Sequence, residues 1–316
     1  MMDEVAIRPF ESDDLDGVVA LLNKELTVDP TTSEIFQRKV LLDANFDPLG
    51  APVAKVGDHI VGFALGMHRK YLMEDQKPDF DRGYISLIAV EREFQRKGIG
   101  TRLWTHLQDF FRRKGAKVAI CGTFAPNYFL PGVDLVAYAG AVEFFKKMGF
   151  TVPVTVISMN SNLLELKTPV WIIEKEAQLA EEGIQFDSFK PRYILPLLDH
   201  LRRCFPGDWQ RYLRDSMVRK TTGDFDRGEI YVAMEGEKCI GFCQHEHERF
   251  GPFGVDEAYR GRGIGAVLLL KCLRGMRAMG MNNAWFMSTT DDAARVYAYG
   301  GFKETRRHAV MRKELD

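Results

Sequence analysis

Residues 95–100 read QRKGIG and return at residues 260–265 as RGRGIG, a spacing of 165 positions in a chain of 316 residues. Both stretches fit the pattern Gln/Arg-x-x-Gly-x-Gly. A glycine-rich turn that opens a helix presents unpaired backbone N–H groups at the positive end of the helix dipole, which suits a phosphate or diphosphate. Glycine also permits a positive φ angle and close approach of a ligand. One such turn is a weak signal, but its recurrence predicts a duplicated binding motif.

The sequence on both sides of the two turns also repeats. Each turn follows an apolar run ending in valine and precedes a helix-period stretch, a strand-like run and an apolar helix ending in Gly-Phe. In the first half these segments are residues 85–90, 101–113, 117–121 and a helix closing at 149–150. In the second half they are residues 253–255, 266–279, 284–288 and a helix closing at 301–302. The two halves are therefore expected to share one core.

The opening of each half repeats as well. An alternating, strand-like stretch begins each half, a helix follows, and two hairpin-like strands come before the turn. These segments are residues 5–10, 12–26, 52–56 and 60–67 in the first half, and 184–189, 191–204, 229–234 and 238–245 in the second. The order predicts a mixed α/β fold with two domains, each a mixed central sheet flanked by helices. We expect the domains at residues 1–165 and 183–316, joined by a linker helix at 166–182.

The first half is longer than the second between the turn and the closing Gly-Phe. From Gly98 to Gly149 there are 51 positions, whereas from Gly263 to Gly301 there are 38. The surplus lies in residues 125–134, APNYFLPGVD, which carry the proline and glycine of a loop. Long loops are often functional, although an inserted surface turn is an equally open interpretation.

Composition excludes several classes of protein. The chain has 43 Lys and Arg against 44 Asp and Glu, so it lacks the basic excess typical of a nucleic-acid-binding protein. No apolar run reaches the ~18–20 residues that span a bilayer, and the acidic start does not resemble a signal peptide. The five cysteines are scattered, which indicates a reduced, cytoplasmic protein rather than a disulfide framework. We expect no contact with nucleic acid or membrane.

Two other binding motifs were weighed. Gly261, Gly263 and Ala266 also satisfy the dinucleotide pattern Gly-x-Gly-x-x-Gly/Ala, but the turn follows several strands of its half and no acidic residue stands about 20 positions on. Cys239, Cys243, His245 and His247 share one parity on a strand, and four groups spread over roughly 26 Å of strand cannot converge on one ion. The sequence therefore predicts neither a nicotinamide cofactor nor a metal.

The strand with its valine, the turn, and the helices and strand that follow resemble the acetyl-CoA-binding core of the GCN5-related N-acetyltransferases (GNAT). Both halves resemble it, so the chain resembles a tandem acyl-CoA N-acyltransferase of this family. The resemblance implies that coenzyme A lies with its diphosphate on the turn and that the N–H of Val90 or Val255 faces the acetyl carbonyl. The coenzyme-binding turns would be Gln95, Arg96, Lys97, Gly98, Ile99, Gly100 and Thr101, and Arg260, Gly261, Arg262, Gly263, Ile264, Gly265 and Ala266.

The resemblance also implies a catalytic acid and a base. In this family a tyrosine four residues before the closing Gly-Phe commonly protonates the departing thiolate; this position is Tyr297 in the second half but Phe145 in the first. Tyr128 or Tyr138 would replace it only if the inserted loop folds back. The acceptor amine loses a proton to a carboxylate or histidine. Glu246 and Glu248 are the first choices for this base, with His68 and Glu74 occupying the similar region of the first half.

The resemblance thus implies an acetyl-CoA-dependent N-acetyltransferase that acts directly on a primary amine of a small molecule or a peptide. The intact turn and Tyr297 favour chemistry in the C-terminal half, and the N-terminal half would then bind coenzyme A without catalysis or shape the substrate site. A catalytically inactive acetyl-CoA-binding or sensing module, or two active halves, are the alternatives. The acceptor does not follow from the residues, and both a monomer and a homodimer are compatible with two fused halves.

Overall fold

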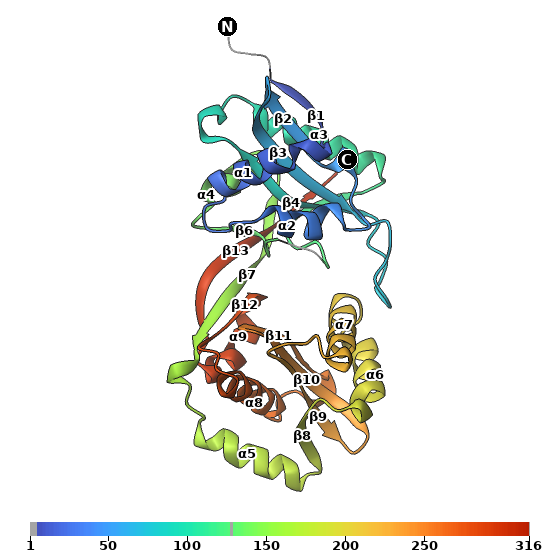
Figure 1. The fold of residues 1–316 in the computed structure, drawn as a ribbon, viewed down its shortest axis with the longest axis vertical. Helices are drawn as coiled ribbons and strands as arrows, with labels where there is room; N and C mark the ends of the chain where they lie inside the picture. The colour runs from blue at the N-terminus through green and yellow to red at the C-terminus, as the bar shows by residue number, and fades with distance from the viewer. Residues whose placement is uncertain (1–4, 127–128, 316) are drawn as a thin grey trace. The chain divides into compact units, whose positions relative to one another are not determined.

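The structure is a computed structural model that describes residues 5–126 and 129–315 (Figure 1). It contains two compact units. The N-terminal unit comprises residues 1–71, 78–156 and 307–316, and the C-terminal unit comprises residues 72–77 and 157–306. The mixed α/β fold with two similar halves that the sequence predicts is confirmed.

The N-terminal unit is built on a sheet in the order β1-β2-β3-β4-β5-β13. Neighbouring strands are antiparallel except for β4 and β5, which are parallel. Its elements are β1 (Ala6–Pro9), α1 (Leu15–Glu25), α2 (Ser33–Phe36), β2 (Pro52–Val56), β3 (His59–His68), β4 (Arg82–Val90), α3 (Ile99–Arg113), β5 (Val118–Cys121), β6 (Val133–Asp134), α4 (Ala139–Lys147), the start of β7 (Thr151–Asn162) and the end of β13 (Lys303–Glu314).

The C-terminal unit repeats this plan with the strand order β7-β12-β11-β10-β9-β8. Here β11 and β12 are the parallel pair. Its elements are the end of β7, α5 (Val170–Glu181), β8 (Ile184–Ser188), α6 (Ile194–Cys204), α7 (Asp208–Thr222), β9 (Gly228–Glu235), β10 (Lys238–Glu246), β11 (Arg249–Val255), α8 (Ile264–Ala278), β12 (Asn283–Thr289), α9 (Asp291–Tyr297) and the start of β13.

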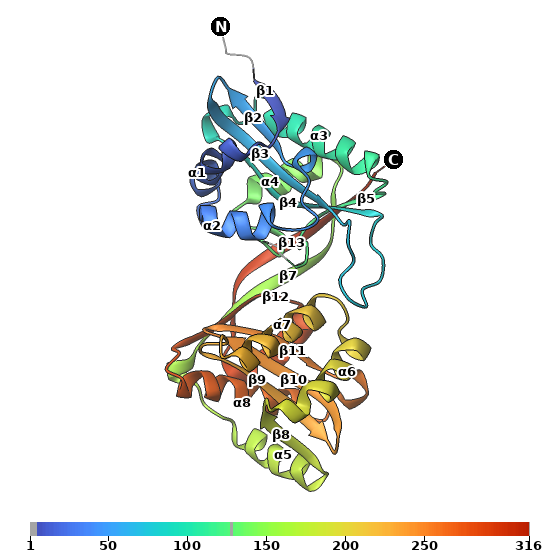
Figure 2. The same cartoon turned by 45° about the vertical axis from the view of Figure 1, so that its right-hand side comes forward.

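Helices cover both faces of each sheet, which gives two apolar layers per unit (Figure 2). In the N-terminal unit α3 and α4 pack on one face and α1 and α2 on the other. In α3 the buried side chains of Ile99, Leu103 and Leu107 recur every four residues, so one stripe of the helix faces the sheet. In the C-terminal unit α5 and α8 take one face, and α6 and α7 the other.

The last strand of each half completes the sheet of the other unit. In the N-terminal unit β13 pairs with β5, where Met311 lies opposite Cys121. In the C-terminal unit β7 pairs with β12, where Met159 lies opposite Phe286. The compact units therefore follow the sheets rather than the order of the chain, and the end of the chain belongs to the N-terminal core.

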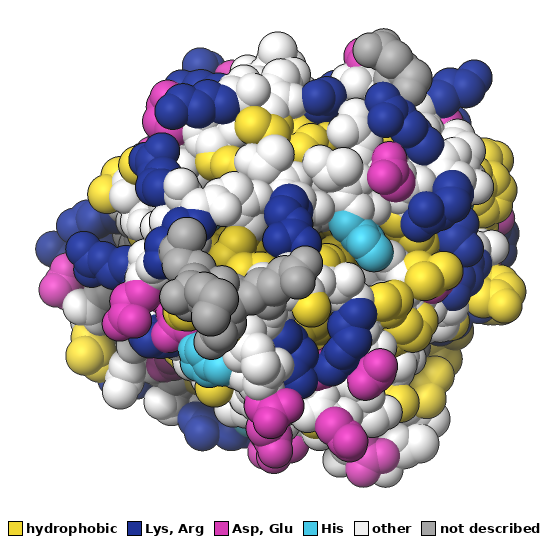
Figure 3. Space-filling view, turned by 90° about the horizontal axis from the view of Figure 1, so that it is seen from above, with side chains coloured by type: hydrophobic (Ala, Val, Ile, Leu, Met, Phe, Trp, Pro, Cys, Tyr) yellow, Lys and Arg dark blue, Asp and Glu magenta, His cyan; other side chains and the backbone are white. Residues whose placement is uncertain are grey.

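Charged side chains are mixed on the face that Figure 3 shows. Among the residues coloured there, Lys and Arg are interspersed with acidic and apolar side chains and do not gather into one patch. Within the described part of the chain, none of the helices combines the length and apolar composition needed to cross a bilayer.

Because Met311 is fully buried in the N-terminal core, Met311→Ala should destabilise that unit by about 2–5 kcal/mol through the cavity it leaves. Hydrogen exchange of the peptide that covers Val118–Cys121 measures this directly, and its protection should fall. Arg312→Ala, on the exposed next residue of the same strand, is the control and should leave exchange unchanged. Unchanged protection in Met311→Ala would contradict the pairing of β13 with β5.

Candidate functional site

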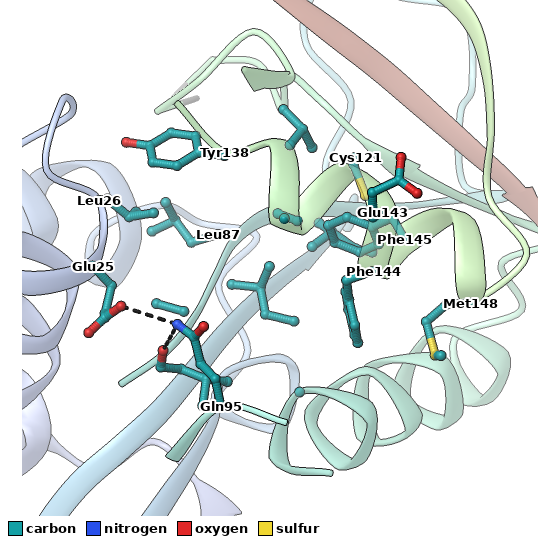
Figure 4. A pocket seen from close by; sticks show the side chains of 18 of the residues that line it. Glu25, Leu26, Leu87, Gln95, Cys121, Tyr138, Glu143, Phe144, Phe145 and Met148 are labelled. Atoms are coloured by element: carbon teal, nitrogen blue, oxygen red, sulfur yellow. Dashed lines mark hydrogen bonds between the residues drawn. The ribbon is translucent and has the colours of Figure 1, made fainter. Parts of the chain in front are cut away.

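A pocket of about 640 Å³ opens in the N-terminal unit between β4, β5, α4 and the start of α3 (Figure 4). It exists because β4 and β5 pair only from Arg82 to Ile85 on β4 and from Val118 to Cys121 on β5. β5 ends at Cys121, whereas β4 continues to Val90, and residues 86–90 of β4 line the pocket. The pocket therefore contains a strand edge that has no neighbouring strand.

The backbone N–H of Val90 points toward this open edge. The N–H of Glu91, the next residue, donates to the carbonyl of Val61 on β3 at 2.9 Å. Because successive N–H groups on a strand point in opposite directions, that of Val90 points away from β3. The carbonyl of Val90 accepts a hydrogen bond from Nε2 of Gln95 at 2.8 Å. This bond ties the start of the turn to the end of the strand.

The turn after β4 lies open at one end of the pocket. Gly98 is the N-cap of α3, with φ of 82°, and a Cβ added there would meet no atom within 4 Å. Arg96 adopts a left-handed φ of 61° although it is not glycine, which keeps a cationic side chain in the turn. Of the predicted coenzyme residues of this half, those that line the pocket are Val90, Gln95, Arg96, Gly98, Gly100 and Thr101.

The two remaining residues of this turn have other positions. Ile99 is buried in the core beneath the turn. The ammonium of Lys97 lies 5.1 Å from the centre of the Phe94 ring. Lys97 and Ile99 are absent from the pocket wall as the structure describes it.

The inserted loop folds back over the pocket. Leu130, Gly132, Ala137 and Tyr138 line it, and Figure 4 shows the Tyr138 ring beside Leu26 and Leu87. One carboxylate oxygen of Asp134 accepts hydrogen bonds from the backbone N–H groups of residues 136 and 137, each at 2.8 Å, which shapes the entry into α4. The Tyr138 hydroxyl donates to Asp29 at 2.7 Å. Tyr128 lies outside the described residues.

A phenylalanine stands where the family commonly has its acid. Phe145 is buried, and its ring lies 5.1 Å from that of Phe150 and 5.3 Å from that of Phe144. It therefore contributes apolar surface and no proton. Among the described residues that line the pocket, Tyr138 carries the one phenol.

Glu25, at the end of α1, supports the turn from the opposite side. Its carboxylate accepts the backbone N–H of Arg92 at 2.9 Å and Nε2 of Gln95 at 3.3 Å (Figure 4). Sequence reasoning missed this residue, because its position on the pocket follows from the packing of α1 and not from a motif.

The turn of the C-terminal unit has the same backbone but a different surface. Gly263 is the N-cap of α8, with φ of 89°. The N–H of Asp256 donates to the carbonyl of Ile240 on β10, so the N–H of Val255 points to the opposite, open side of β11. A Cβ added at Gly263 would lie 2.8 Å from Cγ of Lys175 on α5. The guanidinium of Arg262 is paired with Glu182 at 2.6 Å. Side chains from α5 and the residue after it therefore cover this turn.

Aromatic rings occupy the space between β11 and β12. The spacing of 165 positions holds across the parallel pair, since Tyr84 lies opposite Ile120 and Arg249 lies opposite Trp285. At this spacing Ile88 and Cys121, which line the N-terminal pocket, correspond to Phe253 and Phe286. Two small side chains are thus replaced by two rings. The ring of Phe253 reaches the start of α8, where a Cβ added at Gly265 would lie 3.3 Å from it.

Tyr297 packs within this aromatic group. The centre of its ring is 4.5 Å from that of Phe286, 5.7 Å from that of Phe253 and 6.0 Å from that of Phe250. Burial raises the pKa of the Tyr297 hydroxyl above its ordinary value, and a hydrogen bond with Thr289 offsets this only in part. The hydroxyl therefore holds its proton strongly at neutral pH.

The two predicted bases are engaged in other contacts. Burial alone would raise the pKa of Glu246, but the Arg219 guanidinium at 2.5 Å and the Tyr212 hydroxyl at 3.4 Å keep that pKa below its ordinary value. Glu248 accepts the backbone N–H of Asn283 at 3.2 Å, at the start of β12. A general base works best with a pKa near the operating pH, so these contacts do not prepare Glu246 for that role.

Comparison with known proteins identifies the fold and the family. The acetyltransferase (GNAT) family profile matches residues 18–150 and 194–302. A mycothiol acetyltransferase of Rhodococcus erythropolis is 25% identical in an alignment of 274 residues that covers 81% of each chain.

Solved structures share the fold at low identity. A GCN5-related N-acetyltransferase of Sphaerobacter thermophilus matches with a TM-score of 0.71 and 17% identity, over 98% of this chain and 96% of that one. A tandem GNAT protein from the clavulanic acid biosynthesis pathway matches with a TM-score of 0.64 and 15% identity, over 99% of both chains. The glucosamine N-acetyltransferase region of a fungal multi-domain β-N-acetylglucosaminidase matches with a TM-score of 0.77 and 21% identity, over 98% of this chain and 38% of that longer one.

The family profile matches two separate segments, and each segment contains a helix that begins at a glycine turn. The chain belongs to the GNAT acetyltransferase family and is an N-acetyltransferase with two copies of the family core.

Proposed function

We propose that the pocket of the N-terminal unit holds acetyl-CoA and that the acetyl group passes there to a primary amine of a small molecule or a peptide. The observation that carries this proposal is the pocket itself, with an open glycine turn at one end and the Val90 N–H on its strand edge. The backbone N–H groups of the turn and the Arg96 guanidinium suit a diphosphate. The unpaired edge of residues 86–90 suits the amide groups of a pantetheine arm, which can add to it like a strand.

Acetyl-CoA supplies a thioester, and the residues of the chain assist its attack by the amine. The Val90 N–H donates to the carbonyl oxygen as negative charge develops there, which is worth roughly 3 kcal/mol for a preorganised donor. The Tyr138 hydroxyl, which donates to Asp29 at 2.7 Å in this structure, turns from that carboxylate and gives its proton to the departing thiolate. Glu25 and Glu143 are the carboxylates among the described lining residues, and we assign the amine proton to Glu25, which is half-buried whereas Glu143 is exposed.

The C-terminal unit is the second candidate for the chemistry because Tyr297 occupies the position that the family commonly uses for its acid. Coenzyme binding there requires Lys175 to leave Gly263 and the Phe253 ring to leave the start of α8. In the N-terminal unit the Phe144 ring lies as near to Gly100, at 3.4 Å from an added Cβ, but no atom lies within 4 Å at Gly98, so the N-cap glycine is where the two turns differ. The relative named as a mycothiol acetyltransferase makes small-molecule amines the first acceptors to test.

Substituting the N-cap glycine tests where the coenzyme binds. Gly98→Val places a branched side chain in the open turn and should weaken acetyl-CoA binding by at least about 10-fold, or about 1.4 kcal/mol, in titration calorimetry. Gly57→Val is the matched control, because Gly57 also has a positive φ, of 59°, but lies outside the pocket wall. Gly263→Val should leave the affinity and a stoichiometry of one per chain unchanged. Loss of binding in Gly263→Val alone would place the coenzyme in the C-terminal unit.

Exchanging Ile88 and Phe253 tests whether the side chain at this strand position decides which unit binds the coenzyme. Ile88→Phe copies Phe253 into the N-terminal pocket and should abolish measurable acetyl-CoA binding without altering the turn. Phe253→Ile removes the ring from the space between β11 and β12 and should leave N-terminal binding intact. Retained binding in Ile88→Phe would show that the coenzyme does not use the space beside β4.

Two tyrosine variants separate the two candidate acids. Tyr138→Phe should lower kcat by about 100-fold and leave acetyl-CoA affinity within a factor of about two, because only thiolate protonation is removed. Tyr297→Phe should leave kcat nearly unchanged. Thiol release from acetyl-CoA with the best acceptor of an amine panel measures both. The opposite pattern would return the chemistry to the C-terminal unit.

A further inference from the structure

Three side chains of metal-ligating type meet in the C-terminal unit, between α6 and the strand end that leads into the second glycine turn. His200 and Cys204 lie one turn apart on α6, and Asp256 directly follows β11. One ligand atom from each residue, a ring nitrogen, the sulfur and a carboxylate oxygen, lies within 4.8 Å of the other two. The sequence prediction of no metal rested on the cysteines and histidines of β10, so it did not address this cluster.

His200 has a buried polar ring without a hydrogen-bond partner. Its side chain has no exposed surface, and neither Nδ1 nor Nε2 has a partner among the described residues. The ring packs against Phe205 and Phe242 at 5.5 and 5.8 Å between centres. A buried polar group without a partner costs about 1–3 kcal/mol of stability, and a ligand on a ring nitrogen would remove this cost. A metal ion binds the neutral imidazole through a ring nitrogen.

A metal ion at Asp256 would replace contacts that the carboxylate already makes with two cations and with the Cys204 thiol, and Arg203 lies 3.9 Å from that sulfur as well. Oδ1 accepts the backbone N–H of Ala258 at 3.0 Å and so fixes the carboxylate. Oδ2 receives Arg203 at 3.2 Å and has the Lys238 ammonium at 4.0 Å. Arg203 also holds Asp199 at 2.8 Å, so it keeps a partner when Oδ2 turns to another cation.

Cys204 provides access to the cluster from solvent. It is half-buried, whereas His200 and Asp256 are buried. A thiol binds a metal ion as the thiolate, so its proton leaves when the ion binds.

We propose that His200, Cys204 and Asp256 bind one divalent transition-metal ion of the zinc type, with water in the fourth position. Imidazole, thiolate and carboxylate are the ligands that Zn²⁺ takes in proteins. Bonds of about 2.0–2.3 Å place tetrahedral ligand atoms about 3.3–3.8 Å apart. The three ligand atoms lie within 4.8 Å of one another, so side-chain rotations that move them by roughly 1 Å would bring them to these distances.

A metal here would join α6 to the end of β11. Asp256 follows Val255, and its backbone N–H is bonded to Ile240 on β10 at 2.9 Å. The ion would thus fasten a helix to the strand end that leads into the second glycine turn. We expect it to raise the thermal stability of the C-terminal unit by binding the folded state alone.

Cobalt titration of the full chain tests the site without reference to activity. After treatment with a chelator, Co²⁺ should bind at one per chain and give a thiolate-to-cobalt charge-transfer band in the near ultraviolet, and Zn²⁺ should displace it. Cys204→Ser should remove the band, and Asp256→Asn should weaken binding by at least about 100-fold, since even changes around the ligands cost about 10- to 100-fold. Cys239→Ser alters a buried thiol of β10 outside the cluster and should keep the band.

Circular dichroism and the Tm of each metal-free variant show whether it folds. The absence of a cobalt band in the folded parent protein would overturn the proposal. A band that survives in folded Cys204→Ser would also overturn it, because the thiolate would then come from another residue. If Cys204→Ser does not fold, the Asp256→Asn affinity decides: an unchanged value overturns the site.

Discussion

The end of β5 at Cys121, while β4 continues to Val90, is the constraint on which the N-terminal site depends. Parallel pairing stops at Ile85, so the backbone groups of residues 86–90 that point away from β3 face the pocket instead of a strand. Buried backbone N–H and C=O groups need partners, and a ligand with amide groups can supply them. Val90 lies at the end of this edge, and Gly98 lies at the start of the next helix. One strand and one turn therefore provide the backbone groups that we assign to the acetyl carbonyl and to the diphosphate.

The C-terminal unit meets the same constraint in a different way. Its parallel strands pair in the same register, at Arg249 and Trp285, but the rings of Phe253, Phe286 and Tyr297 pack together beside them. The backbone of the turn is unchanged, with Gly261 and Gly263 in left-handed conformations. The repeated backbone of the turn therefore does not by itself make a binding site. The volume of the side chains beside the turn decides whether a ligand has room.

Local patterns made the elements predictable and left the contacts between them open. The period of Ile99, Leu103 and Leu107 predicted α3, and the repeat predicted two mixed α/β halves. The exchange of β7 and β13 could not be predicted, since a strand pattern does not name its partner. Predicting that aromatic rings fill the space between β11 and β12 would have required the register of these two strands. The position of Tyr138 on the pocket required the path of the inserted loop.

The exchanged strand makes the N-terminal pocket depend on residues that follow the C-terminal half in the sequence. Residues 307–316 follow the C-terminal half in the sequence, yet Met311 lies in the N-terminal core opposite Cys121, which lines the pocket. The N-terminal sheet would lose a strand next to β5 without them, and β5 would become an exposed edge. The pocket thus depends on the second half through packing, whether or not that half holds a coenzyme of its own.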